Sequence, residues 1–538
     1  MLNQYSAVLL SIGMAFTAWG ASPELPRERV DTVLPVQGGN TLGVAADCSD
    51  LQARIDAARP GDTVVIPKGA TCSGNFVLRN KGAVPGWIVI QSGGSLPMPG
   101  FRVTPDKAAQ LAKIVTPNGN PAFRTEAGAH HYRLIGLEVT AAPSAAVNEL
   151  ISFGDGSQAQ KTIEATPTDL IIDRCYIHGS AHQKIKRGVG VNSARTAVVD
   201  SYISEIHAPG VDSQAICGWN GPGPFRIENN FLSASTENVM FGGAAGFLPN
   251  IVPSDIEITG NHFFKPLSWK PGEPGFAGDT WSIKNLLEFK NARRVLVDGN
   301  VFEHIWNGFA VLFTVRTQGG TMPWNAVEDI TLSNNLFRHA GGGMNLSGYD
   351  DEGNNQGVTQ RILFKDNVIE YIDRTRWGGS GVSFQILHGP LDIKIDHNTV
   401  FQSGCMVLVA YSQPSVRFEF TNNVGKGDIC SASDKGIGTS AIEYHFPAAV
   451  VVKNVFAGAK ESSYPPGNFF PARADMVEFA NFAEGDYRLT GGGYKGAGTD
   501  GLDLGANIES VMRASAAALA GSPRPVRTLV REPANRPR

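Results

Sequence analysis

The chain has 538 residues and a formal net charge of −4, and it contains no long run of Lys or Arg. A nucleic-acid partner is therefore disfavoured, because proteins that bind nucleic acids carry clustered positive charge. Only 18% of the residues are charged and 62 are glycine, which fits a fold with many tight turns. Apart from the N-terminus, no segment approaches the ~18 consecutive apolar residues of a transmembrane helix, so we do not expect a membrane-embedded protein.

Residues 1–20 have the composition of a secretory signal peptide. Residues 7–16 form a short apolar core, and Ala18 and Gly20 place small residues where a signal peptidase cleaves. No Lys or Arg precedes the core, which departs from the usual pattern. We therefore expect a secreted protein, either extracellular or periplasmic.

The next segment predicts a capped entry to a repetitive fold. Residues 21–45 contain Pro and Gly without a hydrophobic period, and we interpret them as a leader segment. Residues 49–58 have helical spacing behind Ser49, an N-cap candidate, and residues 63–67 form an apolar strand after the turn at residues 60–62. A helix in this place would cover the open edge of the first layer of strands.

Eight asparagines recur at one phase of a degenerate motif. Each follows an alternating apolar segment and precedes a second short apolar step, as in Ile393-Lys394-Ile395-Asp396-His397-Asn398-Thr399-Val400. The intervals run from 25 to 39 residues, and two earlier copies carry Cys175 and Ser201 at the same phase. The eight residues are Asn230, Asn261, Asn300, Asn335, Asn367, Asn398, Asn423 and Asn454. A repeat of this length is typical of a stacked, solenoid architecture.

The repeat predicts a coil of strands, because its apolar residues alternate at period two. Asn tolerates the left-handed conformation, so it suits a sharp bend between two strands. Bends stacked about 4.8 Å apart would let the Asn amides form a hydrogen-bonded ladder. We predict an all-β fold, a right-handed parallel β-helix of about 10–12 rungs over residues 46–505. A C-terminal helix and a flexible tail are expected over residues 506–538.

Two sequence blocks strengthen this interpretation. The opening Pro60-Gly61-Asp62-Thr63-Val64-Val65-Ile66-Pro67 and the block from Trp281 to Trp306 resemble segments of secreted bacterial β-helix proteins. With the Asn ladder, they make the chain similar to the pectate-lyase-like superfamily, whose repeats are of the PbH1 type. That group is described largely by its fold. The resemblance therefore implies shape and secretion, and it implies no defined reaction.

Six cysteines in an exported chain invite disulfide bonds. Cys405 and Cys430 each lie seven residues after a ladder asparagine, Asn398 and Asn423, so they share a phase on adjacent rungs where a disulfide can form. The other four are a second candidate pair beside the cap, Cys48 and Cys72, and two expected buried thiols, Cys175 and Cys217. A cysteine metal site is the alternative, but no CxxC or HxxxH spacing supports it.

The register of the repeat also predicts which side chains face outward on the strand before each Asn motif. In the sequence Leu287-Glu288-Phe289-Lys290 the second and fourth residues point out, and Glu288 and Lys290 are the only charged members of this surface. With Glu237 from a neighbouring turn they form the candidate catalytic set. The candidate substrate-binding residues are Trp219, Asn192, Lys284, Arg316, Asn345 and Gln385. The alternative is a plain salt bridge between Glu288 and Lys290, with Trp219 packed under a loop.

An aromatic side chain beside hydrogen-bonding groups suits a polysaccharide, and the Lys and Arg residues favour an anionic one such as a uronan. A lyase would use Lys290 or an Arg as the base, with Ca²⁺ as a candidate cofactor held by Glu288, Glu237 or Asp212. Typical pectate-lyase motifs are absent, however.

Two other classes remain open. A glycoside hydrolase needs two carboxylates, yet the positions beside Glu288 on adjacent rungs are Met240 and Leu312. A secreted glycan-binding rod without catalysis is the other alternative. We lean towards a uronan or pectin-like polysaccharide lyase acting by β-elimination, and we expect a monomer.

Overall fold

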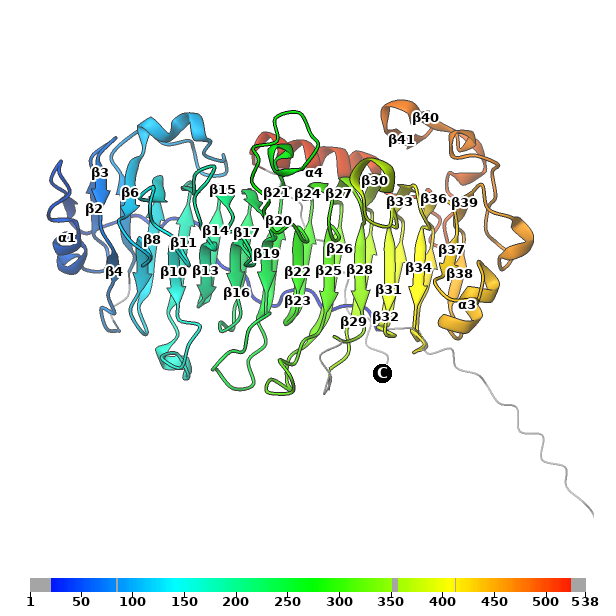
Figure 1. Ribbon diagram of the computed structural model, residues 1–538, viewed down its shortest axis with the longest axis horizontal. Helices are drawn as coiled ribbons and strands as arrows, with labels where there is room; N and C mark the ends of the chain where they lie inside the picture. Colours follow the sequence, from blue (N-terminus) through cyan, green and yellow to red (C-terminus); the bar gives the residue numbers. More distant parts are fainter. Residues whose placement is uncertain (1–20, 84–85, 351–356, 412, 524–538) are drawn as a thin grey trace, which may run out of the picture.

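The computed structural model describes residues 21–83, 86–350, 357–411 and 413–523, and their strands form three long parallel sheets. The predicted signal peptide at residues 1–20 and residues 524–538 of the predicted tail lie outside this range. Apart from the first step of the 14-stranded sheet, the strand number rises by three from one strand of a sheet to the next, because each turn of the chain adds one strand to each sheet. The stacked turns form an elongated rod (Figure 1).

Sheet A has 14 strands, in the order β1 (Thr41–Gly43), β2 (Thr63–Ile66), β5 (Ile88–Ser92), β8 (His130–Ile135), β11 (Thr168–Asp173), β14 (Ala194–Val199), β17 (Phe225–Glu228), β20 (Ser254–Thr259), β23 (Ala292–Asp298), β26 (Val327–Ser333), β29 (Gln360–Lys365), β32 (Leu391–Asp396), β35 (Glu419–Thr421) and β38 (Val450–Val452).

Sheet B has 13 strands, in the order β3 (Thr71–Ser73), β6 (Ala112–Thr116), β9 (Leu137–Ala141), β12 (Tyr176–His178), β15 (Tyr202–Ile206), β18 (Phe231–Ala234), β21 (His262–Phe264), β24 (Val301–Ile305), β27 (Leu336–Ala340), β30 (Val368–Ile372), β33 (Thr399–Gln402), β36 (Val424–Lys426) and β39 (Val455–Ala457).

Sheet C has 12 strands, in the order β4 (Phe76–Leu78), β7 (Phe123–Thr125), β10 (Ile151–Gly154), β13 (Arg187–Asn192), β16 (Gln214–Gly218), β19 (Glu237–Phe241), β22 (Leu287–Phe289), β25 (Val311–Thr314), β28 (Met344–Ser347), β31 (Phe384–Leu387), β34 (Val407–Ala410) and β37 (Ile429–Ser431). The three sheets hold more strands than the Asn repeat alone predicts, because strands before residue 130 belong to turns that lack the motif.

The core lies between the three sheets, where inward side chains from successive turns stack on one another. Phe263, Phe302 and Phe337 form one such column in sheet B, with ring centroids 4.4 and 4.6 Å apart. All three are buried. Each rung therefore buries its apolar face only against its neighbours, as expected for a solenoid.

In the part of the chain that the structure describes, besides several short 3-10 turns, four α-helices and one hairpin lie outside the three sheets. They are α1 (Leu51–Ala57), α2 (Arg374–Trp377), α3 (Thr439–His445), α4 (Ile508–Ala520) and the antiparallel pair β40 (Phe479–Asn481) and β41 (Asp486–Leu489). Helix α1 contacts β2 and β4 at the first rungs, and α4 lies along the turns of sheet B (Figure 1). In the described residues, no helix is both long enough and apolar enough to cross a membrane.

The repeated asparagines are joined by side-chain hydrogen bonds along the rod. Asn300 Oδ1 accepts from the backbone N–H and the Nδ2 of Asn261, at 2.8 and 3.0 Å. Asn300 Nδ2 in turn donates to Asn335 Oδ1 at 3.0 Å. The column continues beyond the motif to Asn468, whose Oδ1 accepts from Asn454 N at 2.9 Å. The sequence repeat misses Asn468, because it follows Asn454 by only 14 residues.

The left-handed residue at this bend is not the ladder asparagine, which corrects one part of the sequence interpretation. Positive φ occurs one residue earlier, for example at Asn229 (54°), Asn334 (54°) and His397 (51°). The ladder residue is Asn because a single amide accepts and donates along the stack, and its backbone conformation plays no part in the choice.

We expect Asn300→Ala to lower the free energy of unfolding by about 3 kcal/mol. The substitution leaves the amide groups of Asn261 and the carbonyl of Ile258 buried without their partner, and each such group costs about 1–3 kcal/mol. Denaturant unfolding followed by circular dichroism measures the change. Asn40→Ala, at an exposed asparagine, is the matched control and should change stability by less than about 0.5 kcal/mol. Equal stability of the two variants would show that the side-chain hydrogen bonds of the Asn ladder do not stabilise the fold.

The predicted leader is extended and lies across sheet A as a strap, which we define as residues 21–36. Glu24 N donates to Asp329 Oδ1 at 3.2 Å, and Arg27 N donates to Asp255 Oδ1 at 2.8 Å. The strap therefore crosses the strands from β26 back towards β1, and Figure 1 shows it as a thin blue segment along the rod.

Both predicted disulfides are confirmed. Cys48 is bonded to Cys72, and Cys405 is bonded to Cys430 on the adjacent rung. The free thiols, Cys175 and Cys217, are buried.

Candidate functional site

A column of polar side chains crosses sheet C at the first residue of consecutive strands. Arg187, Gln214 and Glu237 open β13, β16 and β19, and they are paired in register. Arg187 Nε donates to Gln214 Oε1 at 3.1 Å, and Gln214 Nε2 donates to Glu237 Oε2 at 2.8 Å. The rungs thus hold an arginine, an amide and a carboxyl group in one hydrogen-bonded line.

One end of the column borders a cavity of about 410 Å³. Glu149 lies there beside Arg187, with Oε1 3.4 Å from a guanidinium nitrogen. Its carboxylate occupies the space over Gly190, where any side chain would collide with it. The guanidinium also lies over the Trp219 ring, 4.6 Å from the centroid. Burial raises the pKa of Glu149, which faces this cavity.

At the other end a second carboxylate, Glu288, lies on β22. Lys290 Nζ is 2.9 Å from Glu288 Oε1, and Asn285 Nδ2 donates to Oε2 at 2.9 Å. The register predicted for Glu288 is confirmed, since its neighbours on the adjacent strands are Met240 and Leu312. The salt bridge named as the alternative in the sequence interpretation is present.

Glu237 and Glu288 are both buried, with 1% and 3% of their surface exposed. Burial, with the negative charge of Glu288 as the next cause, raises the pKa of Glu237 to about 8. A carboxyl group with a raised pKa therefore lies near a second buried carboxyl group, Glu288, that is paired with Lys290. A carboxyl group with a raised pKa next to a second acidic group is typical of acid–base sites.

Further cations stand at the rim of this site. Lys284 Nζ lies 2.7 Å from Asp212 Oδ1 and is about half exposed. Arg316 pairs with Asp350 at 2.7 Å. Lys290 is less exposed, at 14% of its side chain, and it is the charged member of the Glu288 pair nearer to solvent. Exposed or partly exposed cations therefore surround the buried carboxyl groups.

The other sequence-predicted residues have different surroundings. Asn192 is buried, and its Oδ1 accepts from the backbone N–H groups of Trp219 and Asn220, so it fixes a turn. Asn345 Nδ2 donates to Gln385 Oε1 at 2.6 Å on neighbouring strands, several rungs from Glu237. The Trp219 ring carries the Arg187 guanidinium on one side and packs on Gly156, so it is not an open stacking platform.

Sequence reasoning missed Glu149, Gln214 and Asn285 as members of the site. The signal was available in the register, because each precedes the first inward residue of its strand by two positions, as Glu237 does. Arg187 lies in the same column and was not among the candidate site residues.

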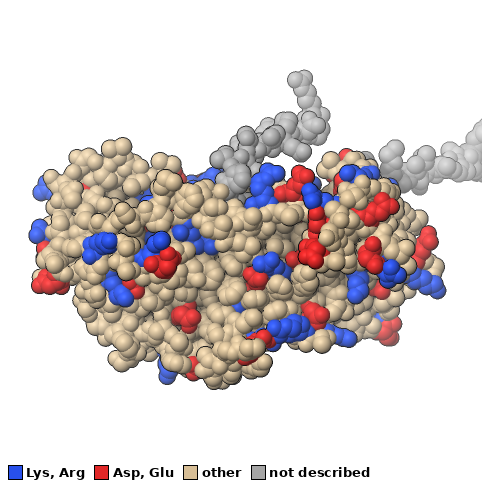
Figure 2. All heavy atoms as spheres, turned by 90° about the horizontal axis from the view of Figure 1, so that it is seen from above, with Lys and Arg blue, Asp and Glu red and all other residues tan. Residues whose placement is uncertain are grey.

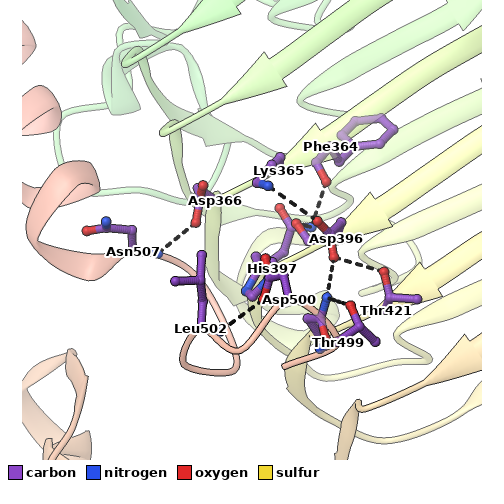
Figure 3. A network of polar contacts seen from close by, with 12 residues as sticks. Phe364, Lys365, Asp366, Asp396, His397, Thr421, Thr499, Asp500, Leu502 and Asn507 are labelled. Atoms are coloured by element: carbon purple, nitrogen blue, oxygen red, sulfur yellow. Dashed lines mark hydrogen bonds and ion pairs between the residues drawn. The ribbon is translucent and has the colours of Figure 1, made fainter. Parts of the chain in front are cut away.

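A larger cavity, of about 700 Å³, lies between the C-terminal segment and the turns beside sheet B. Figure 3 shows that the polar groups here join the segment to the rungs. Asp366 accepts from Asn507 N at 2.9 Å, and His397 Nε2 lies 3.1 Å from Asp500 Oδ2. These groups attach the C-terminal segment to the rod. On the face that Figure 2 views, acidic and basic side chains are interspersed.

Comparison with known proteins identifies the architecture. No family model and no curated protein matches the chain. Among solved structures it is similar to AlyGC, an alginate lyase of polysaccharide lyase family 6, with a TM-score of 0.51 at 11% identity. That match covers 88% of this chain but only 57% of AlyGC, so the chain spans little more than half of that protein.

Two further solved structures match with lower TM-scores. An alginate lyase from Paenibacillus sp. strain FPU-7 matches at a TM-score of 0.33 and 14% identity over 80% of this chain and 98% of that one. PfbA, a surface adhesin of Streptococcus pneumoniae, matches at 0.42 and 13% over 76% and 94%. Together with the stacked three-sheet topology, the AlyGC match shows that this chain is a right-handed parallel β-helix.

Proposed function

We propose that the protein is a carbohydrate-active enzyme that cleaves an acidic polysaccharide by β-elimination on sheet C. The observation that carries this proposal is the buried pair Glu237 and Glu288 on neighbouring strands, with Lys290 paired to Glu288 and the pKa of Glu237 raised. Arg187 and Lys284 add positive charge on either side. Cations bind the carboxylate of a uronate, and that neutralisation makes its C5 proton easier to remove.

In the proposed reaction Lys290 is the base. Glu288 takes one proton from the ammonium group, and the resulting amine removes the C5 proton of the uronate. The C4–O4 bond breaks, a C4–C5 double bond forms, and Glu237 supplies the proton that the departing O4 oxygen needs. A carboxyl with a pKa near 8 holds that proton at neutral pH, as this role requires.

The residues considered for Ca²⁺, Asp212, Glu237 and Glu288, do not fit a calcium site. Asp212 is paired with Lys284 and Glu288 with Lys290, and the raised pKa of Glu237 favours its neutral form, whereas Ca²⁺ prefers ionised carboxylates. The proposed reaction therefore uses Lys290 and the neighbouring cations to neutralise the uronate carboxylate.

A glycoside hydrolase is the second candidate, because a protonated and an ionised carboxyl also serve glycosidic hydrolysis. The two reactions give different products. A lyase yields an unsaturated uronate that absorbs in the ultraviolet, while a hydrolase yields reducing ends without that absorbance.

The test is incubation with alginates, pectates and glycosaminoglycans, with both readouts. Alginate is the first substrate to test, because AlyGC is an alginate lyase. We expect an increase in ultraviolet absorbance that Lys290→Ala and Glu288→Gln abolish, while Lys460→Ala, at an exposed lysine, retains it. Unchanged turnover in both site variants would reject this location. Retention on a glycan column without any product would favour a binding protein over an enzyme.

We also propose that the protein acts outside the cytoplasm. Two disulfide bonds support this, because disulfides persist in oxidising compartments. The predicted signal peptide points the same way.

A further inference from the structure

Three potential metal ligands converge on the outer face of sheet B, away from the sheet C column. They are Glu303 and His304 on β24 and His339 on β27. Glu303 Oε1 lies 3.2 Å from His339 Nδ1 and 3.9 Å from His304 Nε2. The three ligand atoms all lie within 4.8 Å of one another.

The backbone explains how adjacent residues on one strand reach the same side. His304 and His339 both have left-handed backbone conformations, with φ of 64° and 58°. They occupy equivalent positions on neighbouring strands, because Glu303 pairs with Arg338 and Ile305 pairs with Ala340. The kink interrupts the usual alternation, so Glu303 and His304 both project outward. The next strand has the same conformation at the equivalent position, Tyr371 (50°), so the fold itself sets the direction of these side chains.

Hydrogen bonds already orient the first imidazole and the carboxylate. His304 Nδ1 lies 3.3 Å from the carbonyl oxygen of Lys265. A carbonyl only accepts, so Nδ1 carries the proton and the lone pair of Nε2 faces Glu303. Glu303 Oε2 accepts from His262 Nε2 at 3.1 Å, and this contact leaves Oε1 towards the two imidazoles. Metal-binding histidines commonly donate their second nitrogen to a backbone carbonyl in this way.

An aromatic lid covers the cluster. Trp377, on α2, lies over the rings of His304 and His339 with centroid distances of 5.3 and 5.7 Å. Trp377 itself is 6% exposed, and the side chains of His304 and Glu303 are 14% and 10% exposed. The His339 side chain is 33% exposed, so the cluster is shielded on the Glu303 and His304 side and open to solvent at His339. Partial shielding strengthens electrostatic attraction for a cation, and the open side gives the ion access.

We propose that Glu303, His304 and His339 form a binding site for a divalent transition-metal ion of the Zn²⁺ class. An ion with bonds of about 2.1 Å in tetrahedral geometry needs ligand atoms about 3.4 Å apart. The separations of 3.2 and 3.9 Å bracket that value, so small side-chain rotations complete the site, with water as the fourth ligand. Two imidazoles with one carboxylate select such ions over Ca²⁺ and Mg²⁺.

Arg338 is the group that an incoming ion replaces. Its Nε lies 3.0 Å from Glu303 Oε1, and its side chain is 26% exposed, so it can turn outward. The site therefore exchanges one cation for another. It follows that Arg338→Gln, which removes the competing charge, binds the metal more tightly than the wild type.

The test uses the untagged full-length protein, dialysed against chelator and titrated with Zn²⁺ by calorimetry and with Co²⁺ by visible absorption. We expect saturable binding of one ion and absorption bands typical of a low-symmetry Co²⁺ site. His304→Ala and His339→Ala should each weaken Zn²⁺ binding at least about tenfold, and Arg338→Gln should strengthen it. His182→Ala, at an exposed histidine away from the cluster, is the matched control.

Equal affinity in His304→Ala, His339→Ala and wild type would overturn the proposal, as would the absence of saturable binding in all of them. Weaker binding in Arg338→Gln would also overturn it, because it would show that the arginine supports the ion. Glu303→Gln and Glu303→Asp serve as a second pair, with only the aspartate expected to retain part of the affinity. The proposal does not depend on the proposed lyase activity, and metal affinity is measured without substrate.

Discussion

Glu237→Gln is expected to lower kcat on an acidic polysaccharide by about 10²- to 10⁴-fold, the usual contribution of a general acid. The amide keeps the hydrogen bond with Gln214 but has no proton to transfer. In the wild type, the acid form of Glu237 is lost as the pH rises through its pKa of about 8. Activity should therefore fall above that pH, and the residual activity of the variant should lack this alkaline limb.

The measurement is a kcat/KM profile against pH for the wild type, Glu237→Gln and Glu443→Gln, the last at an exposed glutamate on α3. A wild-type profile without an alkaline limb, or full activity of Glu237→Gln, would reject the assignment of Glu237 as the acid.

The pH dependence of stability is a second check of the raised pKa of Glu237. Because the folded state holds this proton between the ordinary pKa of 4.5 and about 8, wild-type stability falls with rising pH in that window. The variant should be relatively more stable above it.

Lys265→Met is expected to destabilise the fold by about 3 kcal/mol or more. Lys265 is fully buried, and its Nζ donates to the carbonyl oxygens of Ala234, Ser235 and Thr236 at 2.8, 3.0 and 2.9 Å. Methionine matches its length but leaves three buried carbonyls without a donor, at about 1–3 kcal/mol each. These carbonyls shape the turn that leads into Glu237, so catalytic activity should also decline.

Chemical denaturation of Lys265→Met and of the exposed control Lys460→Met measures the effect. Burial lowers the pKa of Lys265 to about 7, while the ordinary value is 10.5. The unfolded chain therefore binds more protons than the folded one between these values, and the stability advantage of the wild type should grow as the pH rises from 7 to 10.5. Equal stability of Lys265→Met and Lys460→Met would contradict a structural role for the buried ammonium.

The fold could be predicted because its repeat is visible in the amino-acid sequence. The spacing of Asn300, Asn335 and Asn367 gives the rungs, and the alternating residues between them give the strands. The same register placed Glu288 correctly between Met240 and Leu312.

The site was predicted only in part, because the outward direction of a side chain on a strand does not determine whether that side chain is exposed to solvent. Glu288 and Lys290 were found from alternation, whereas Gln214 and Glu149 appear only when hydrogen bonds between rungs are seen. Asn192 shows the opposite error, since its outward position in the pattern ends in a buried turn. The histidine cluster escaped the pattern, because a left-handed residue in each strand changes the side on which His304 and His339 project.

The strap over sheet A constrains the order in which the chain can assemble. Its first contact joins residues that are 305 positions apart, since Glu24 binds to Asp329. During synthesis from the N-terminus, this segment can make its contact with Asp329 only after β26 has formed. The rod can grow rung by rung, but the earliest part of the chain docks among the last. The strap, residues 21–36, thus completes its contacts with sheet A only after the strands that it crosses have formed.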